Sequence, residues 1–304
     1  MAAPDFPWSR YLAAKAGLDD RSLNQQVWQR LRREAASRGR PLAVLELGAG
    51  VGTMVPRLLT WGLPLPWRYT LLERDPALVS RARELLPPAL AAGGLAGEWE
   101  SPERFLCPGP SGRTEFRFLS RDFFAPELPG EGPWDIIIAH AFLDLLDLAD
   151  AVRRLTRLSR AGALWWLTLL PDGITAFLPA EDPAEDAAVE AAYHASMDLD
   201  PAVVPGRGGS RTGRRLLELL PRAGAKLLAA GASDWVVTPP YDPGEEFFLA
   251  CMLGFHEASL TGRGLDQARL GPWLARRRAQ LRTGRLSLLV HQLDILALWP
   301  GESG

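Results

Sequence analysis

The sequence predicts an α/β fold built on a doubly wound, mostly parallel sheet, and three observations support this prediction. Between residues 42 and 170, short apolar runs alternate with segments in which apolar residues recur at helical spacing. The first run leads through a glycine-rich turn into a helical segment. A later run, residues 134–140, is apolar almost throughout, as expected for a strand buried on both faces in a parallel sheet.

The glycine-rich turn follows the first predicted strand, residues 42–47. Gly48, Gly50 and Gly52 occupy alternate positions and remove every Cβ from one side of the loop. The N–H groups at the start of the following helix form an edge that favours anions. Glu46 stands at the end of the strand, where its carboxylate can meet a cationic group or the backbone donors of a ligand. We therefore expect a ligand to approach the backbone at this turn.

A second acid, Glu73, stands in the second predicted strand, residues 68–74, near its end. A carboxylate at this position can accept hydrogen bonds from both hydroxyls of a ribose. A nicotinamide-binding site would use the same arrangement. However, the dinucleotide fingerprint has a glycine three residues after its second glycine, and Thr53 stands there. The glycine spacing therefore argues against a nicotinamide cofactor.

The pattern Glu46-x-Gly48-x-Gly50-x-Gly52 resembles motif I of the class I S-adenosylmethionine-dependent methyltransferases, and Glu73 matches that family's acid after the second strand. The resemblance implies a Rossmann-like core of seven strands, the last of them antiparallel, with S-adenosyl-L-methionine as cofactor. It is good over residues 43–170 and 211–237, moderate over the last strand and weak over the insertions.

The predicted third strand, residues 114–119, is soon followed by Asp122 and Phe123. The resembled family has at this place an acid that accepts from the adenine amino group, followed by an apolar residue against the base. Asp122 would supply the acceptor and Phe123 a flat apolar wall. The alternative is that Asp122 only caps the next turn.

The run 134–140 ends in His140, at the carboxyl edge where open α/β sheets bind ligands. In the resembled family, the residues after this fourth strand face the transferring methyl group. His140 is therefore the candidate catalytic residue, as a general base or as a group that orients the acceptor. A histidine bonded only to the backbone is the alternative. Asp144 is expected to cap the next helix, residues 145–158.

Residues 7–38 are predicted to be helical, and Asp19 or Asp20 is expected to cap a helix whose apolar residues recur at three- and four-residue spacing. In the resembled family, such a leading helix folds over the cofactor. The alternative is an amphipathic helix that only covers the sheet.

After a fifth strand, residues 163–170, the regular alternation breaks, and pattern resumes with a helix from residue 210 and a sixth strand, residues 226–237. Two predicted helices, residues 245–260 and 266–282, precede the last strand. Two insertions over one ligand edge suggest a lid or an acceptor chamber. The expected division is an N-terminal segment over the cofactor (1–41), the core (42–170), an insertion (171–210), the core continued (211–237), a helical insertion (238–285), and the last strand with the tail (286–304).

Composition excludes several classes of function. The chain has 304 residues, 47% hydrophobic content and a net charge of −2, which gives no electrostatic case for nucleic acid or an anionic membrane. Its two cysteines match no metal or disulfide pattern. No apolar run approaches the length of a membrane span, and the N-terminus lacks a signal-peptide core. We expect a cytoplasmic protein that holds no metal.

The sequence as a whole predicts a methyltransferase that acts on a small-molecule acceptor by in-line transfer from S-adenosyl-L-methionine. A nucleic-acid acceptor is disfavoured, because the chain has no basic patch. The alternatives are a fold relative that binds the cofactor without catalysis and a nicotinamide-dependent oxidoreductase. The protein is expected to be a monomer or a homodimer.

Overall fold

The computed structural model describes residues 6–128, 132–198, 206–263 and 265–301. The ends of the expected N-terminal segment and tail, and parts of the two insertions, therefore lie outside the described residues. The strands are β1 (Leu42–Leu47), β2 (Trp67–Glu73), β3 (Glu98–Ser101), β4 (Arg104–Cys107), β5 (Thr114–Ser120), β6 (Trp134–His140), β7 (Ser159–Leu178), β8 (Lys226–Ala232), β9 (Trp235–Val237) and β10 (Ser287–Trp299).

The helices, in chain order, are α1 (Trp8–Ser22), α2 (Gln25–Ala36), α3 (Met54–Thr60), α4 (Pro76–Ala92), α5 (Leu148–Leu158), α6 (Pro183–Asp198), α7 (Thr212–Arg222), α8 (Glu245–Leu260) and α9 (Gln267–Arg282). Two short 3-10 turns, Leu143–Leu145 and Gly209–Arg211, follow β6 and precede α7.

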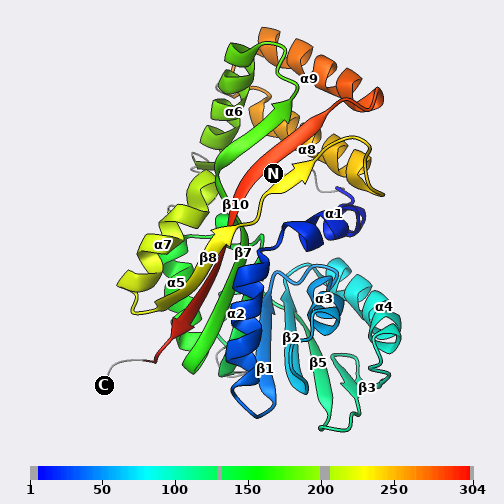
Figure 1. Cartoon of the computed structure of the whole chain (residues 1–304), viewed down its shortest axis with the longest axis vertical. Coiled ribbons are helices and arrows are strands. Elements are labelled where there is room, and N and C mark those ends of the chain that lie inside the picture. The colour runs from blue at the N-terminus through cyan, green and yellow to red at the C-terminus, as the bar shows by residue number, and fades with distance from the viewer. Residues whose placement is uncertain (1–5, 129–131, 199–205, 264, 302–304) are drawn as a thin grey trace.

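One ten-stranded sheet organises the molecule, in the order β3-β4-β5-β2-β1-β6-β7-β10-β8, with β9 paired to β10 (Figure 1). The strands from β5 to β7 are mutually parallel, and β10 is antiparallel to both β7 and β8. The predicted fold class is confirmed: the expected seven strands are β1, β2, β5, β6, β7, β8 and β10. The predicted sixth strand, residues 226–237, is divided into β8 and β9, and two further strands, β3 and β4, were not predicted.

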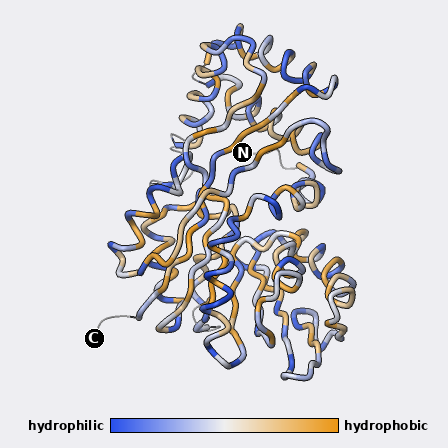
Figure 2. The backbone as a smooth tube through the Cα atoms, viewed as in Figure 1, coloured by the Kyte–Doolittle hydropathy of each residue, from blue (hydrophilic) through white to orange (hydrophobic). Residues whose placement is uncertain are grey.

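Helices cover both faces of the sheet. Apolar side chains of α2, α3 and α4 join one core cluster with alternate residues of β1, such as Leu42 and Val44. The other residues of β1, such as Leu45 and Leu47, join a second cluster with α5 and α7. The hydropathy of the chain follows this division, since apolar segments lie on the strands inside the molecule (Figure 2). Burial on both faces explains why these strands are apolar without alternation.

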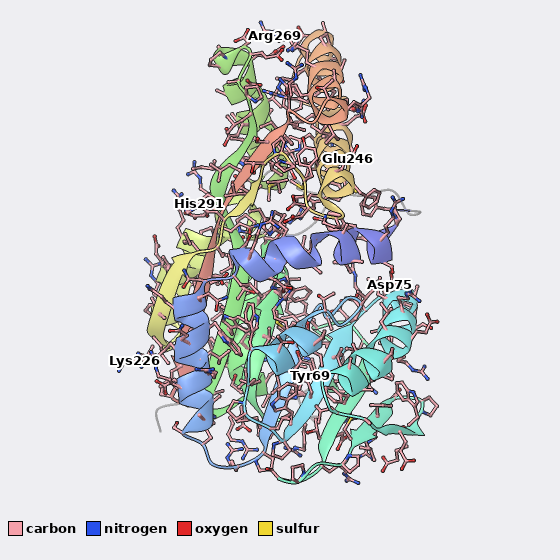
Figure 3. The ribbon with its side chains drawn as sticks, turned by 45° about the vertical axis from the view of Figure 1, so that its right-hand side comes forward. Tyr69, Asp75, Lys226, Glu246, Arg269 and His291 are labelled. Carbon is pink, nitrogen blue, oxygen red and sulfur yellow. The ribbon has the colours of Figure 1, made fainter. Side chains whose placement is uncertain are left out.

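The upper part of the molecule is an outgrowth of the sheet. β7 continues past residue 170 and pairs with the first half of β10, and α6, α8 and α9 surround this extension (Figure 1). α1 lies across the molecule between the core that contains Tyr69 and the upper part that contains Glu246 (Figure 3). Among the described residues, no helix is both long and apolar enough to span a membrane.

Several local predictions were wrong. Asn24 caps α2, because its side chain accepts from the N–H groups of Gln26 and Val27, whereas Asp19 and Asp20 lie inside α1. Asp147, and not Asp144, caps α5 through the N–H of Asp150 at 2.9 Å. Residues 88–113, where Pro88, Gly93 and Gly94 are typical of a long connection, contain the end of α4 and the β3–β4 hairpin.

Candidate cofactor and acceptor site

The glycine loop joins β1 to α3 at the carboxyl edge of the sheet. Gly48, Gly50 and Gly52 all have positive φ angles, of 62°, 55° and 81°. A Cβ at Gly48 would lie 2.5 Å from a ring carbon of Phe142, and a Cβ at Gly50 would lie 2.8 Å from Leu12. At these three positions only glycine combines the backbone conformation with the available space. The predicted turn therefore has the geometry that its sequence requires.

Glu73, at the end of β2, faces this loop. One carboxylate oxygen, Oε2, accepts from the backbone N–H of Gly50 at 3.1 Å, and Oε1 accepts from that of Asp75 at 3.0 Å. The side chain is half-buried. A carboxylate is thus held beside the glycine loop, as a ribose site needs.

Glu46 is placed differently from the expectation. Its side chain is buried beneath the loop and accepts from the Tyr69 hydroxyl at 2.8 Å. Burial raises its pKa to about 8, although the Tyr69 hydrogen bond and Arg57 oppose this rise. Glu46 is therefore largely protonated at neutral pH and braces β1 against β2. Direct contact with a ligand is not supported by this geometry.

Asp122 and Phe123 follow β5, whose last residue, Ser120, pairs with Glu73. Asp122 is exposed, and its Oδ1 accepts from the N–H of Phe124 at 2.8 Å, so it caps a turn as the alternative proposed. A carboxylate can accept further hydrogen bonds besides this one. Phe123 is only 4% exposed and packs in the core, whereas Phe124 is 43% exposed. The ring that solvent reaches is therefore that of Phe124, and not that of Phe123.

His140 ends β6 and is bonded at both ring nitrogens. Nε2 lies 3.1 Å from a carboxylate oxygen of Asp19, and Nδ1 lies 2.8 Å from the hydroxyl of Thr168. Because an ionised carboxylate only accepts, Nε2 donates and Nδ1 accepts from Thr168. Burial lowers the pKa of His140 to about 4, with Asp19 opposing. The ring is neutral and offers no free lone pair, so this arrangement does not support the general-base role.

Asp19 connects α1 to the sheet, which the sequence did not indicate. Its buried carboxylate accepts from Lys15 at 2.5 Å and from the indole N–H of Trp235 at 3.0 Å, in addition to His140. Burial raises the pKa of Asp19, but the charge of Lys15 and the hydrogen bond from His140 together lower it by more. The pKa of Asp19 therefore lies well below its ordinary value. The network holds α1 against β6 and β9, directly above the carboxyl edge.

Two residues in the segment after His140, Phe142 and Asp144, contribute more to this edge of the sheet than the sequence indicated. Ala141 has a φ angle of 49°, which is strained for a residue with a Cβ, and the next residue, Phe142, stands over Gly48. Burial raises the pKa of Asp144 to about 6, and the guanidinium of Arg207 lowers it in part. A carboxyl group that titrates near neutrality beside the ligand edge is a candidate proton acceptor. The sequence signal for it was its position after the fourth strand.

The residue types at this edge, a glycine loop and a neighbouring carboxylate, are those that S-adenosyl-L-methionine needs. Side-chain atoms of Phe142, Leu12 and Leu86 pack closely against the three glycines of the loop, and the loop lies beside the Glu73 carboxylate. Leu12 and Phe142 cover the loop from above, so ligand entry requires these side chains to move. Within the described residues, there is no group of three or more histidine, cysteine, aspartate or glutamate side chains placed to hold a metal ion.

Comparison with known proteins gave similarities at the level of structure only. No family model and no curated protein matches the chain. A proposed methyltransferase from Bacillus halodurans is 12% identical, with 91% of this chain and 100% of that chain covered and a TM-score of 0.49. A proposed sarcosine dimethylglycine methyltransferase from Galdieria sulphuraria is 13% identical, with 92% and 85% covered and a TM-score of 0.45.

A third structure is the magnesium protoporphyrin IX methyltransferase from Synechocystis with bound S-adenosylhomocysteine. It is 13% identical, with 77% of this chain and 83% of that chain covered and a TM-score of 0.41. The names of these three structures are those of methyltransferases. At these identities and TM-scores, none of the similarities carries an argument about activity or substrate.

Proposed function

We propose that the chain is an S-adenosyl-L-methionine-dependent methyltransferase that acts on a small-molecule acceptor. The observation that carries this proposal is the pairing of the loop Gly48–Gly50–Gly52, whose glycines all have positive φ angles, with the carboxylate of Glu73, which accepts from the N–H of Gly50. The glycine spacing supports this cofactor over a nicotinamide dinucleotide, since Thr53 stands where the dinucleotide fingerprint has a glycine.

In this proposal, Glu73 binds the ribose hydroxyls and Asp122 accepts from the adenine amino group. Phe124, the exposed ring beside Asp122, replaces Phe123 as the apolar surface for the base. Glu46 acts indirectly, since its contact with Tyr69 fixes the strand from which the glycine loop departs. When bound, the cofactor supplies an electrophilic methyl group on a sulfonium, which it brings to the reaction itself.

The protein's task is then to align the acceptor, exclude water and, where the acceptor loses a proton, remove it. Leu12 and Phe142 shield the glycine loop from water. Asp144 is the proposed proton acceptor, because its carboxyl group titrates near neutrality at the carboxyl edge. His140 becomes a positioning residue that fixes α1 through Asp19.

A small molecule is proposed as the acceptor because α1 lies between the core and the upper part of the molecule, where Asp19 of α1 bonds to His140 at the carboxyl edge (Figure 3). A net charge of −2 gives no attraction for nucleic acid.

The test is transfer of a labelled methyl group from the cofactor to a panel of small alcohols, amines, thiols and carboxylic acids. Label in a product, absent with Gly50→Val, would support the proposal. Tight cofactor binding without label transfer across the panel and across protein extracts would favour the non-catalytic alternative. Reduction of a substrate by a nicotinamide cofactor would overturn the proposal.

A further inference from the structure

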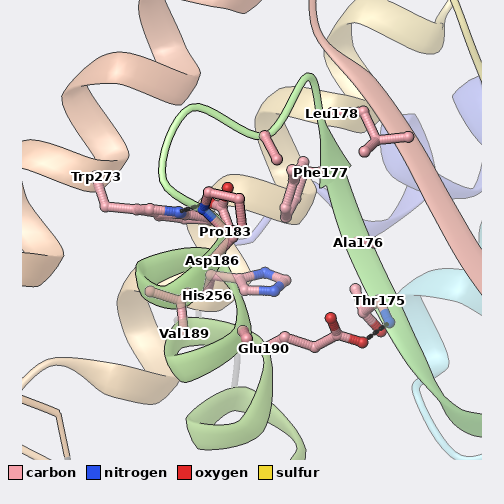
Figure 4. Close-up of a pocket in the computed structure, with 12 residues that line it drawn as sticks. Thr175, Ala176, Phe177, Leu178, Pro183, Asp186, Val189, Glu190, His256 and Trp273 are labelled. Carbon is pink, nitrogen blue, oxygen red and sulfur yellow. Dashed lines mark hydrogen bonds between the residues drawn. The ribbon is translucent and has the colours of Figure 1, made fainter.

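A cavity of about 190 Å³ lies in the upper part of the molecule, outside the glycine-loop site. The end of β7, α6, α8 and α9 line this half-open cavity, and all of its lining residues lie beyond residue 170 (Figure 4). Most of its wall is apolar, with side chains such as Phe177, Val189 and Trp273. The polar atoms in this wall determine what it can bind.

His256 stands in the wall and is 1% exposed. Its Nδ1 lies 2.8 Å from the carbonyl oxygen of Met252, one helical turn earlier, and must carry the hydrogen because a carbonyl only accepts. Burial lowers the pKa of His256 to about 4, so the ring is neutral at pH 7. The lone pair of Nε2 then has no hydrogen-bond partner among the described residues. A buried acceptor of this kind is costly unless a donor reaches it.

Neighbouring rings fix the orientation of this acceptor. Tyr193 stacks on His256 with ring centroids 3.7 Å apart and an interplanar angle of 17°. Phe177 meets the imidazole edge-on at 5.1 Å, and Trp273 lies at 6.1 Å. Three rings and the Met252 hydrogen bond hold the imidazole, and Nε2 is fully buried, so a ligand donor reaches Nε2 only as the neighbouring rings shift.

Two carboxylates of the cavity wall also accept. Oδ1 of Asp186 accepts from the indole N–H of Trp273 at 2.7 Å and from Arg277, while Oδ2 is buried without a partner among the described residues. Oε1 of Glu190 accepts from the N–H of Thr175 at 2.9 Å (Figure 4). Asp186 is already paired with the charge of Arg277. The cavity therefore calls for a ligand that donates a hydrogen bond but brings no charge.

We propose that this cavity binds a small, uncharged, mostly apolar molecule with an O–H or N–H donor, and that this donor bonds to Nε2 of His256. An apolar cavity of ~150 Å³ accommodates benzene, so the volume suits a single ring with one substituent. The site depends on neither the cofactor nor the glycine loop, and it can exist even if the proposed methyl transfer does not.

Phenol is a suitable probe, and toluene is its matched control because a methyl group replaces the hydroxyl. The chain has four histidines, so nitrogen-15 labelling of histidine gives a spectrum that resolves each ring. Titration of the whole chain with phenol at pH 7 should shift Nε2 of His256 strongly, with little effect on His140 or His291. Toluene should leave that nitrogen almost unchanged.

Variants separate the hydrogen bond from the packing. In His256→Phe, the ratio of phenol affinity to toluene affinity should fall about tenfold relative to the parent protein, as for loss of one hydrogen bond. His291→Phe, a change outside the cavity, should leave the ratio unaltered. Ala187→Leu, a change in α6 at the cavity wall, should weaken both probes by narrowing the cavity while α6 stays folded.

Three results would overturn the proposal: no phenol binding by the parent protein, a phenol shift at another histidine in place of His256, or an unchanged affinity ratio in His256→Phe. If circular dichroism shows that His256→Phe is unfolded, Ala187→Leu decides. Unaltered phenol affinity in that variant would place the probe elsewhere. Cofactor titrations have no part in these outcomes, so failure here leaves the proposed methyl transfer standing.

Discussion

The carboxylate of Glu73 accepts a hydrogen bond from the backbone N–H of Gly50 at 3.1 Å, across the 23 residues that separate the two positions. This contact joins the end of β2 to the middle of the glycine loop. It holds an acceptor for hydroxyl groups beside a backbone that carries no Cβ at Gly48, Gly50 or Gly52. The proposed cofactor site depends on this pair.

Gly50→Val is predicted to abolish cofactor binding. A side chain at this position meets Leu12, and the φ angle of 55° is unfavourable for a β-branched residue. Calorimetric titration with S-adenosylhomocysteine measures the effect. Gly17→Ala is the matched control, because Gly17 lies in α1 and a methyl group added there would have no atom within 4 Å. Equal affinity in both variants would contradict the placement of the site.

Glu73→Ala is predicted to weaken cofactor binding by roughly 100-fold, because two hydrogen bonds to a charged group are lost. Asp122→Ala should weaken it less, since Asp122 is exposed and its contact with the base is a single hydrogen bond. Calorimetry with folded variants compares them, and Glu84→Ala, an exposed change on α4, serves as the control. A Glu73→Ala variant with parental affinity would rule out the ribose contact.

Asp144→Asn is predicted to lower kcat and to change its pH dependence. Burial raises the pKa of Asp144 to about 6, so a proton-accepting carboxylate is present above this pH and disappears as the pH falls below it. The rate of the parent enzyme should therefore fall between pH 7 and pH 5. The rate of the variant should not show this fall. A fall in rate between pH 7 and pH 5 that persists in Asp144→Asn would assign the titration to another group.

Asp19→Asn is predicted to destabilise the fold by about 3 kcal/mol, because Lys15 would remain buried without its charge partner. Glu84→Gln should cost less than about 1 kcal/mol, since the Glu84 side chain is 61% exposed and that of its partner Arg81 is 47% exposed. Urea unfolding measures both. Similar values for the two variants would mean that the Asp19 network contributes little to holding α1.

Glu46→Gln tests the protonation state of the buried carboxyl group. Its pKa rises from 4.5 to about 8 on folding, so between these values the folded state holds a proton that the unfolded state has lost. The stability of the parent protein should therefore fall as the pH rises, by up to roughly 1.4 kcal/mol per pH unit from this group.

Glutamine accepts the Tyr69 hydrogen bond without titrating, so the stability of the variant relative to the parent should increase from pH 5 to pH 8.5. Urea unfolding at both pH values gives the two differences. A constant difference would show that Glu46 is ionised in the folded protein.

The strands and helices of the core could be predicted because their signals are local. The bounds of β6 and α8 coincide with the predicted runs. The conformation of the glycine loop is indicated by Gly48, Gly50 and Gly52, which all have positive φ angles. β7 was predicted to end at residue 170, since Pro171 and Gly173 are strand breakers. Pairing with β10, which shifts register between His291 and Gln292, extends it to Leu178.

The contacts of the site could not be predicted in the same way. Asp19 meets His140 and Trp235 across 121 and 216 residues, and a carboxylate inside a helix carries no local sign of such partners. Phe123 and Phe124 are chemically equal in the sequence, and only the packing of the second core cluster decides which one is buried. Residue types identified the site, but tertiary packing assigns their roles.

Titration of the purified protein with S-adenosyl-L-methionine and S-adenosylhomocysteine by calorimetry tests the central claim most directly. We predict micromolar binding of both, loss of binding in Gly50→Val and no heat with a nicotinamide dinucleotide. Absence of binding by folded parent protein, or binding of the nicotinamide dinucleotide in place of these ligands, would contradict the proposed cofactor and the site built on Gly50 and Glu73.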